Sequence, residues 1–204
     1  MVVIIFDLET SGLNPYHEDI IEIGAKVLGE DNSFQMLLKP KSGRPISKKI
    51  TELTGITNKD LRKDGKDWKN AYGEFYNWLF EIVKSGDPLT LVSHNGVSFD
   101  FVFFKRMLRD LEQVIDEINI DVDTINFVDT LPLSKRLYPN RTYYSQPSLA
   151  KTFSIIVDNA HRAMGDVIVL EQLYLRIMKD FNIHSGADGL EDPRKVGDYI
   201  NLKI

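Results

Sequence analysis

Apolar residues in the first part of the chain follow the patterns of strands. Residues 2–6 are apolar without interruption and mostly β-branched, which predicts a strand buried on both faces. Residues 19–29 and 33–40 form two further apolar stretches, and the turn-forming sequence Gly-Glu-Asp-Asn between them predicts a hairpin. The chain therefore begins with three predicted strands.

The next segment has the capping residues, the terminal glycines and the apolar periodicity of helices. Ser47 and Thr57 are helix-capping residues ahead of two short helical segments that end at Gly55 and Gly65. An apolar stripe with helical spacing then runs over residues 68–82. Its aromatic residues could form a base-stacking surface, but stripes at this spacing usually form a core, and we adopt that interpretation.

The remaining pattern mixes strands with helices and predicts an α/β domain. Strands are predicted at residues 88–95 and 126–129, and helices at residues 98–118, 130–139, 145–153 and 165–181, the first of them opened by Ser98. A segment rich in Gly and Asp follows without an assignable pattern. We expect one domain over residues 1–182 and a C-terminal extension over residues 183–204.

Composition narrows the class of protein. Hydrophobic residues make up 43% of the chain and charged residues 27%, which is typical of a globular domain rather than a disordered one. The absence of cysteine excludes disulfides and thiolate metal sites. No stretch approaches the roughly 18 apolar residues of a membrane span, and the start lacks a basic signal-peptide flank. We expect a soluble intracellular protein, cytoplasmic or nuclear, without a membrane partner.

Two acidic residues, Asp7 and Glu9, directly follow the first predicted strand. Alternate residues of a strand face the same side, so both carboxylates lie together, opposite Leu8, if the strand continues to Glu9. Such a pair either raises its own pKa values or binds a hard cation such as Mg²⁺, Mn²⁺ or Ca²⁺. Taken alone, the pair is more commonly a solvated strand end or a helix cap.

Further candidates lie at the starts of two predicted helices. Asp100 has aromatic neighbours, and a carboxylate in such surroundings is costly unless it is paired or metal-bound. A favourable interaction with the helix dipole would not explain those neighbours. Asp166 opens the last helix, five residues after His161. On a continuous helix these two side chains would diverge by about 140°, so His161 reaches the same site only from a preceding loop.

Three motifs, FDLETSGL, SHNGVSFDF and HRAMGDV, resemble in this order the exonuclease motifs of the DEDDh group. That group includes the proofreading subunit of bacterial replicative polymerases and the three-prime repair exonucleases. The resemblance covers residues 2–180 and extends to the segments VDTLPLSKRLYP and YSQPSLAKTF. It implies a ribonuclease H-like fold, with helices flanking a mixed five-stranded sheet whose second strand is antiparallel.

The resemblance also implies an activity. It implies 3′ to 5′ hydrolysis of phosphodiester bonds at 3′ ends, with single-stranded or mismatched DNA favoured over RNA, and release of 5′-mononucleotides in proofreading or repair. The implied ligands of two divalent ions, Mg²⁺ or Mn²⁺, are Asp7, Glu9, Asp100 and Asp166, and the implied general base is His161; the implied substrate contacts are Thr10, Leu13, Leu53 and Asn95. Many relatives have His where Thr54 stands, so the sugar contact made there is not carried over.

The net charge of −5 contrasts with the basic surface of most nucleic-acid-binding proteins. Counting out the four implied carboxylate ligands, each −1, leaves −1 for the rest of the chain. A nearly neutral surface does not fit a protein that coats a duplex. It fits an enzyme that holds a few terminal nucleotides at a metal site.

Three alternatives remain open at this point. An RNA-trimming exoribonuclease resembling ribonuclease T or oligoribonuclease would use the same residues. A non-catalytic subunit associated with a polymerase or nuclease would keep the fold without the chemistry, although all five catalytic positions are filled. A two-metal phosphatase for small phosphate esters is the third, and the HNG and SL elements favour polynucleotide substrates over it. A polymerase or another protein is compatible as a partner.

Overall fold

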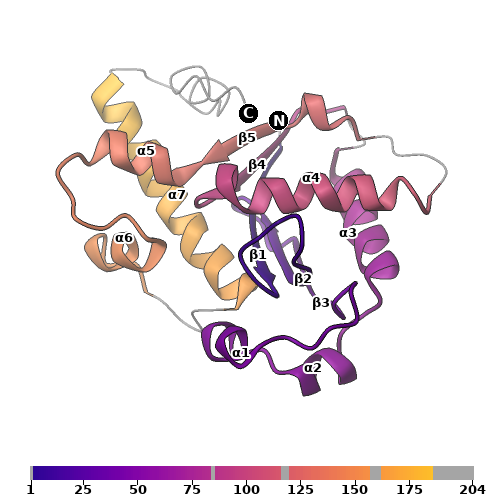
Figure 1. Ribbon diagram of the computed structural model, residues 1–204. Coiled ribbons are helices and arrows are strands. Elements are labelled where there is room, and N and C mark those ends of the chain that lie inside the picture. Colours follow the sequence, from indigo (N-terminus) through magenta and orange to yellow (C-terminus); the bar gives the residue numbers. More distant parts are fainter. Residues whose placement is uncertain (1, 84–85, 116–119, 157–161, 186–204) are drawn as a thin grey trace.

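Strand β1 (Val2–Thr10) lies at the centre of a five-stranded sheet of order β3-β2-β1-β4-β5 (Figure 1). The computed structural model describes residues 2–83, 86–115, 120–156 and 162–185. The other strands are β2 (Ile20–Val27), β3 (Ser33–Leu37), β4 (Leu89–Ser93) and β5 (Asn126–Asp129). Strand β2 is antiparallel to β1 and β3, whereas β4 is parallel to β1 and β5. The predicted mixed sheet with an antiparallel second strand is confirmed.

Helices cover both faces of this sheet. They are α1 (Lys48–Thr54), α2 (Asn58–Lys63), α3 (Trp68–Val83), α4 (Asp100–Leu111), α5 (Thr130–Leu137), α6 (Gln146–Thr152) and α7 (Ala163–Ser185), with 3₁₀ turns η1 (Gly96–Ser98) and η2 (Val122–Thr124). Figure 1 shows α3 and α4 on one side of the sheet and α5, α6 and α7 on the other. Among the residues that the structure describes, no helix combines the length and apolar character needed to cross a membrane.

Alternate residues of β1 face the two helical layers. Ile4, Phe6 and Leu8 belong to the core that packs against α3 and α4. Ile5 instead belongs to the core formed with the buried residues of α7. Because side chains alternate along a strand, Asp7 and Glu9 share the side of Ile5. The apolar core on each face therefore aims both carboxylates toward α7.

The predicted apolar stripe over residues 68–82 is part of the core, as expected. Tyr72, Phe75 and Leu79 of α3 are at most 1% exposed. The ring of Phe75 stacks on that of Phe6 at a centroid distance of 5.9 Å. The aromatic residues of α3 thus pack against β1 on the face of the sheet opposite to Asp7 and Glu9.

Two helices differ from their predicted ranges by two residues or more at both ends: the last helix, predicted over residues 165–181, extends over Ala163–Ser185, and α4 is shorter than predicted at both ends. Ser98 lies in η1 and does not open the helix, which begins at Asp100. After Leu111 the amide of Val114 bonds back only three residues, to the carbonyl of Leu111, so the helix tightens into a turn and ends. The apolar periodicity continues past Leu111, but residues 112–115 form a turn rather than an α-helix.

The predicted extension over residues 183–204 lies outside the described residues except for 183–185, which continue α7.

Strand β2 and helix α7 approach each other closely at Gly24. A Cβ at Gly24 would lie 2.7 Å from the carbonyl carbon of Ala163, the first residue of α7. That distance is too short for any side chain. Glycine at this position therefore allows the start of α7 to lie directly on β2.

Gly24→Ala is expected to lower the free energy of unfolding by about 1–3 kcal/mol, because the added methyl group forces α7 away from β2. Thermal unfolding measures this effect as a fall of roughly 2–4 °C per kcal/mol. Gly73→Ala is the matched control, because nothing lies within 4 Å of a Cβ there and the residue is inside α3. It is expected to stabilise by about 0.5–1 kcal/mol. Equal melting temperatures for Gly24→Ala and the parent would show that the contact is looser than the structure has it.

Candidate active site

Three carboxylates from β1 and α7 form an acidic cluster. Asp7, Glu9 and Asp166 each place one carboxylate oxygen within 4.8 Å of the others. Strand β1 supplies the first two from one face, and Asp166 belongs to the first turn of α7, which contacts that face. Leu8 is only 4% exposed and packs in the opposite core. The structure therefore brings together three of the four predicted ligands, with Leu8 placed as expected.

Asp166 is held at the edge of the packed face of α7. Its neighbour Val167 is fully buried in the core that includes Ile5 of β1. Gln146 of α6 donates from Nε2 to the backbone carbonyl oxygen of Asp166 at 2.9 Å and approaches its Oδ1 at 3.4 Å. Both α6 and the core therefore fix the carboxylate of Asp166 beside β1.

Asp100 approaches the cluster from the N-terminus of α4. Strands β1 and β4 pair from Val2 with Leu89 to Ile5 with Val92. Beyond that pairing, the amide of Leu8 donates to Asp100 Oδ1 at 3.1 Å, and Ser93 Oγ donates to Oδ2 at 2.6 Å. Asp100 thus lies between the ends of the two strands, although it is not one of the carboxylates grouped within 4.8 Å.

Burial and mutual repulsion raise the pKa values of these carboxyl groups. Burial raises the pKa of Asp7 well above its usual range, and the charges of Asp100, Glu9 and Asp166 raise it further. Burial, followed by the charge of Asp166, raises the pKa of Glu9 to about 8. Burial raises the pKa of Asp100 to about 7 against the opposing effect of the hydrogen bonds it accepts. Divalent cations that prefer oxygen ligands, such as Mg²⁺ and Mn²⁺, would relieve this repulsion.

Glu22 is a further carboxylate beside the cluster that the sequence analysis missed. It is fully buried and is the Cα partner of Glu9 in the ladder between β1 and β2. Its carboxylate accepts hydrogen bonds from the guanidinium of Arg162 and from the amide of Ala163. An acid inside an apolar strand signals a buried partner. That signal was present in the sequence, but the partner is 140 residues away.

The turn after β4 holds the predicted substrate contact Asn95. This residue is exposed and has a left-handed backbone conformation, with φ of 67°. Asp129 Oδ1 accepts the hydrogen bond from its amide at 2.8 Å, and Asp129 Oδ2 accepts one from the amide of Val97 at 3.1 Å. His94 contacts Thr130 Oγ1 at 2.9 Å, and burial lowers its pKa. Asp129 and His94, both missed by sequence reasoning, therefore shape this turn.

The other predicted substrate contacts have different surroundings. Leu13 and Leu53 are 78% and 52% exposed, which is unusual for leucine and leaves both available to a ligand. Thr10 is buried, and its hydroxyl donates to the carbonyl oxygen of Gly12 at 2.7 Å. Thr54 is also buried and its hydroxyl donates within α1. The hydroxyls of Thr10 and Thr54 thus donate hydrogen bonds within the protein, Leu13 and Leu53 are exposed, and the substrate contact of Thr10 stays a prediction.

The predicted general base, His161, lies outside the described residues. Helix α7 begins at Ala163, and the described chain resumes at Arg162. The described members of the predicted site are therefore the four carboxylates and the four substrate contacts.

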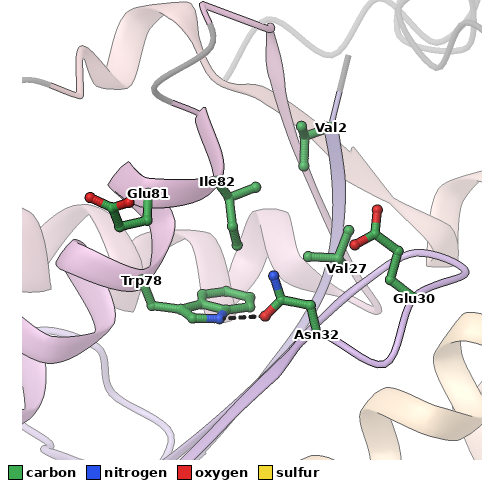
Figure 2. A pocket seen from close by; sticks show the side chains of 7 residues that line it. All are labelled: Val2, Val27, Glu30, Asn32, Trp78, Glu81 and Ile82. Carbon is green, nitrogen blue, oxygen red and sulfur yellow. Dashed lines mark hydrogen bonds between the residues drawn. The ribbon is translucent and has the colours of Figure 1, made fainter.

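A separate pocket lies at the start of β1, the end that does not carry Asp7 and Glu9 (Figure 2). Its lining residues are Val2, Val27, Glu30, Asn32, Trp78, Glu81 and Ile82. Trp78 Nε1 donates to Asn32 Oδ1 at 2.9 Å across it. Val2 precedes Asp7 by five strand residues, which places these two residues about 16 Å apart along β1. This pocket is not part of the candidate active site.

Comparisons with known proteins point to one family. The sequence model of a family described as exonuclease matches residues 4–174. The PolC-type DNA polymerase III of Bacillus subtilis (strain 168) is 34% identical over 180 residues, which cover 87% of this chain and 11% of the polymerase. The polymerase of the same name from Thermotoga maritima is 30% identical over 206 residues, which cover 98% of this chain and 14% of that protein. The chain thus corresponds to a small part of these relatives.

Solved structures of exonuclease I have the same fold. One superposes with a TM-score of 0.70 at 20% identity and covers 87% of this chain and 40% of that one. The E. coli enzyme in complex with a dT13 oligonucleotide gives a TM-score of 0.70 at 19% identity, covering 97% of this chain and 43% of that one. At such identity the likeness shows the fold alone. It confirms the ribonuclease H-like fold that the three motifs implied.

Proposed function

Because the chain belongs to the exonuclease family, we propose that it hydrolyses phosphodiester bonds at the 3′ ends of DNA, single-stranded or mismatched, and releases 5′-mononucleotides. The observation that carries this proposal is the cluster of Asp7, Glu9 and Asp166 within 4.8 Å. Three carboxylates this close repel one another unless protons or cations neutralise them. A protein that only binds a partner gains nothing from carboxylates this close together, whereas a metal-dependent hydrolase needs them to hold its cations.

The cofactors in this proposal are two divalent ions, Mg²⁺ or Mn²⁺, held by Asp7, Glu9, Asp100 and Asp166. The donor set fits, because divalent ions of this kind prefer oxygen ligands and three of these carboxylates lie within 4.8 Å of one another. Each carboxylate oxygen has two lone pairs, so Asp100 can face a cation while it accepts its hydrogen bonds. When bound, such ions stabilise the charge on the attacking and leaving oxygens of the phosphodiester.

The other proposed roles belong to residues around the carboxylates. His161 accepts the proton of the attacking water, a role that suits histidine because the ordinary pKa of an imidazole lies close to neutral pH. Leu13 and Leu53, exposed and apolar, contact the terminal nucleotide. Asn95, exposed at the turn after β4, shapes the pocket beside it.

The preference for DNA rests on the relatives. Two of them are named DNA polymerases, and a structure of similar fold holds a dT13 oligonucleotide. These likenesses support a proofreading or repair role at DNA ends. RNA trimming would use the same carboxylates and is decided by experiment.

Digestion of 5′-labelled strands tests this proposal. Single-stranded DNA, a duplex with a mismatched 3′ end and RNA of the same sequence are incubated with Mg²⁺, with Mn²⁺ or with EDTA. The expected result is a ladder that shortens from the 3′ end of DNA, only with metal. Faster digestion of RNA by orders of magnitude would reverse the substrate preference. Internal cuts, activity in EDTA, or hydrolysis of an aryl phosphate but not of DNA would contradict the proposed reaction.

A further inference from the structure

An ion pair between the buried Glu22 and the partly exposed Arg162 joins β2 to the start of α7. Glu22 is fully buried, and its Oε1 accepts hydrogen bonds from Arg162 Nη2 at 2.7 Å and from Gln35 Nε2 at 2.9 Å. Its Oε2 accepts from Arg162 Nε and from the amide of Ala163, both at 3.1 Å. Both oxygens of this carboxylate are therefore engaged, and the fork of the guanidinium fixes their direction.

The register of the sheet places this ion pair beside the proposed ligands. Glu22 pairs with Glu9 across the ladder, and Gly24 pairs with Asp7. Ala163 contacts both of these β2 residues: its amide donates a hydrogen bond to Glu22, and its backbone packs closely on Gly24. Asp166 follows Ala163 by three residues in the first turn of α7. The start of α7 is thus fixed to β2 at the two residues that lie opposite Asp7 and Glu9.

A fifth carboxylate at this place has an electrostatic cost. Glu22 lies opposite Glu9 in the ladder, where a second carboxylate repels the first unless a cation neutralises it. The guanidinium of Arg162 supplies that positive charge and at the same time joins β2 to the start of α7. A neutral side chain could fill the same space without such a partner, so the ion pair calls for a role beyond packing.

We propose that Glu22 is a positioning residue: through Arg162 and Ala163 it holds the first turn of α7 so that Asp166 meets Asp7 and Glu9 at the distance a metal ion needs. This inference rests on the proposed metal site. Without the ion pair, repulsion among the three carboxylates moves the start of α7 outward. Metal affinity then falls, because metal binding must also move the start of α7 back toward β1, which costs free energy.

A second ion pair between the same two elements provides a matched control. Lys26 of β2 lies 2.6 Å from Glu171 of α7, and both side chains are largely buried. Glu171 also accepts a hydrogen bond from the amide of Gly29. This pair joins β2 to α7 away from the acidic cluster, so Glu171→Gln tests the general attachment of α7 alone.

Calorimetric titration with Mn²⁺ tests the inference on the full chain, with melting temperature recorded in parallel. Glu22→Gln is expected to weaken Mn²⁺ binding roughly 10- to 100-fold, as for other groups that orient metal ligands. Glu171→Gln is expected to lower the melting temperature and to leave Mn²⁺ affinity unchanged. The double variant Glu22→Gln/Arg162→Gln keeps the local net charge and leaves no buried charge unpaired, so it also carries the test if the single variant does not fold.

Positioning and electrostatics predict different results for the double variant. If Glu22 acts by position, the double variant binds Mn²⁺ as weakly as Glu22→Gln. Parent-like affinity in the double variant, or an equal loss of affinity in Glu171→Gln, would overturn the inference. If the parent binds Mn²⁺ and Glu22→Gln binds it with the same affinity, this inference fails while the proposed metal site stands. A parent that binds no Mn²⁺ overturns the proposed metal site, and the inference with it.

Discussion

Asp7→Asn is expected to remove exonuclease activity and, at the same time, to raise the melting temperature of the metal-free protein. Loss of a metal ligand removes several kcal/mol of charge stabilisation, and about 4 kcal/mol corresponds to a rate roughly a thousandfold lower. The same carboxylate costs stability in the metal-free state. Burial and four neighbouring acids raise its pKa, so its ionised form is unfavourable in the folded chain. The neutral amide of Asn removes that cost.

The opposite signs of the two effects make this experiment selective. An ordinary core substitution lowers both activity and stability. Replacing a functional carboxylate that its neighbours repel lowers activity and raises stability. Digestion of labelled DNA with Mg²⁺ measures the first effect, and thermal unfolding in EDTA measures the second, with each kcal/mol shifting the melting temperature by roughly 2–4 °C.

Asp31→Asn serves as the matched control for this prediction. Asp31 is exposed in the turn between β2 and β3, so the same chemical change there is expected to alter neither quantity. If Asp7→Asn digests DNA as fast as the parent, the activity does not come from the acidic cluster. If the variant loses activity but also melts lower, the repulsion argument is wrong even though the catalytic role stands.

The face of the sheet on which Asp7 and Glu9 lie could be predicted, because strand alternation is a local property. The apolar run ends at Phe6, yet β1 continues to Thr10 because β2 pairs with it over that length. The alternation therefore extends through Glu9, and Leu8 packs in the core as predicted. Similarly, the stripe over residues 68–82 predicted α3, because helical periodicity is also local.

The contacts that orient the candidate ligands could not be predicted, because they join distant parts of the chain. The hydrogen bond from the Leu8 amide to Asp100 spans 92 residues. It depends on β4 lying beside β1 and on their pairing ending at Ile5. The order of strands in the sheet, rather than any local pattern, brings these groups together. For the same reason the partner of Glu22 was invisible in the sequence.

The metal-free protein is expected to lose stability as the pH rises from 6.5 to 8. The pKa of Glu9 is raised from 4.5 to about 8 on folding, so within this range the folded state holds a proton that the unfolded state has released. Stability then falls with pH, by at most about 1.4 kcal/mol per pH unit for each such proton. Asp100, with a pKa of about 7, adds to the fall at the lower end. His94, whose pKa is lowered from 6.5, acts in the opposite direction, mainly below pH 6.5 and only weakly at the lower end of this range.

Saturating Mn²⁺ is expected to remove this pH dependence, because a bound cation holds the carboxylates in their ionised form in the folded state. Metal at 100 times its dissociation constant adds about 2.7 kcal/mol to the free energy of unfolding. At one fixed Mn²⁺ concentration the gain is larger at pH 8 than at pH 6.5, because fewer protons must be displaced from the carboxylates. Urea unfolding at both pH values, in EDTA and in Mn²⁺, measures the four free energies. Glu9→Gln is the matched variant and is expected to lose the part of the slope that Glu9 contributes in EDTA, while Asp7 and Asp100 keep the rest. A parent whose stability in EDTA is flat or rises over this range would show that these carboxyl groups ionise at ordinary pH, and the electrostatic argument for a metal site would then fail.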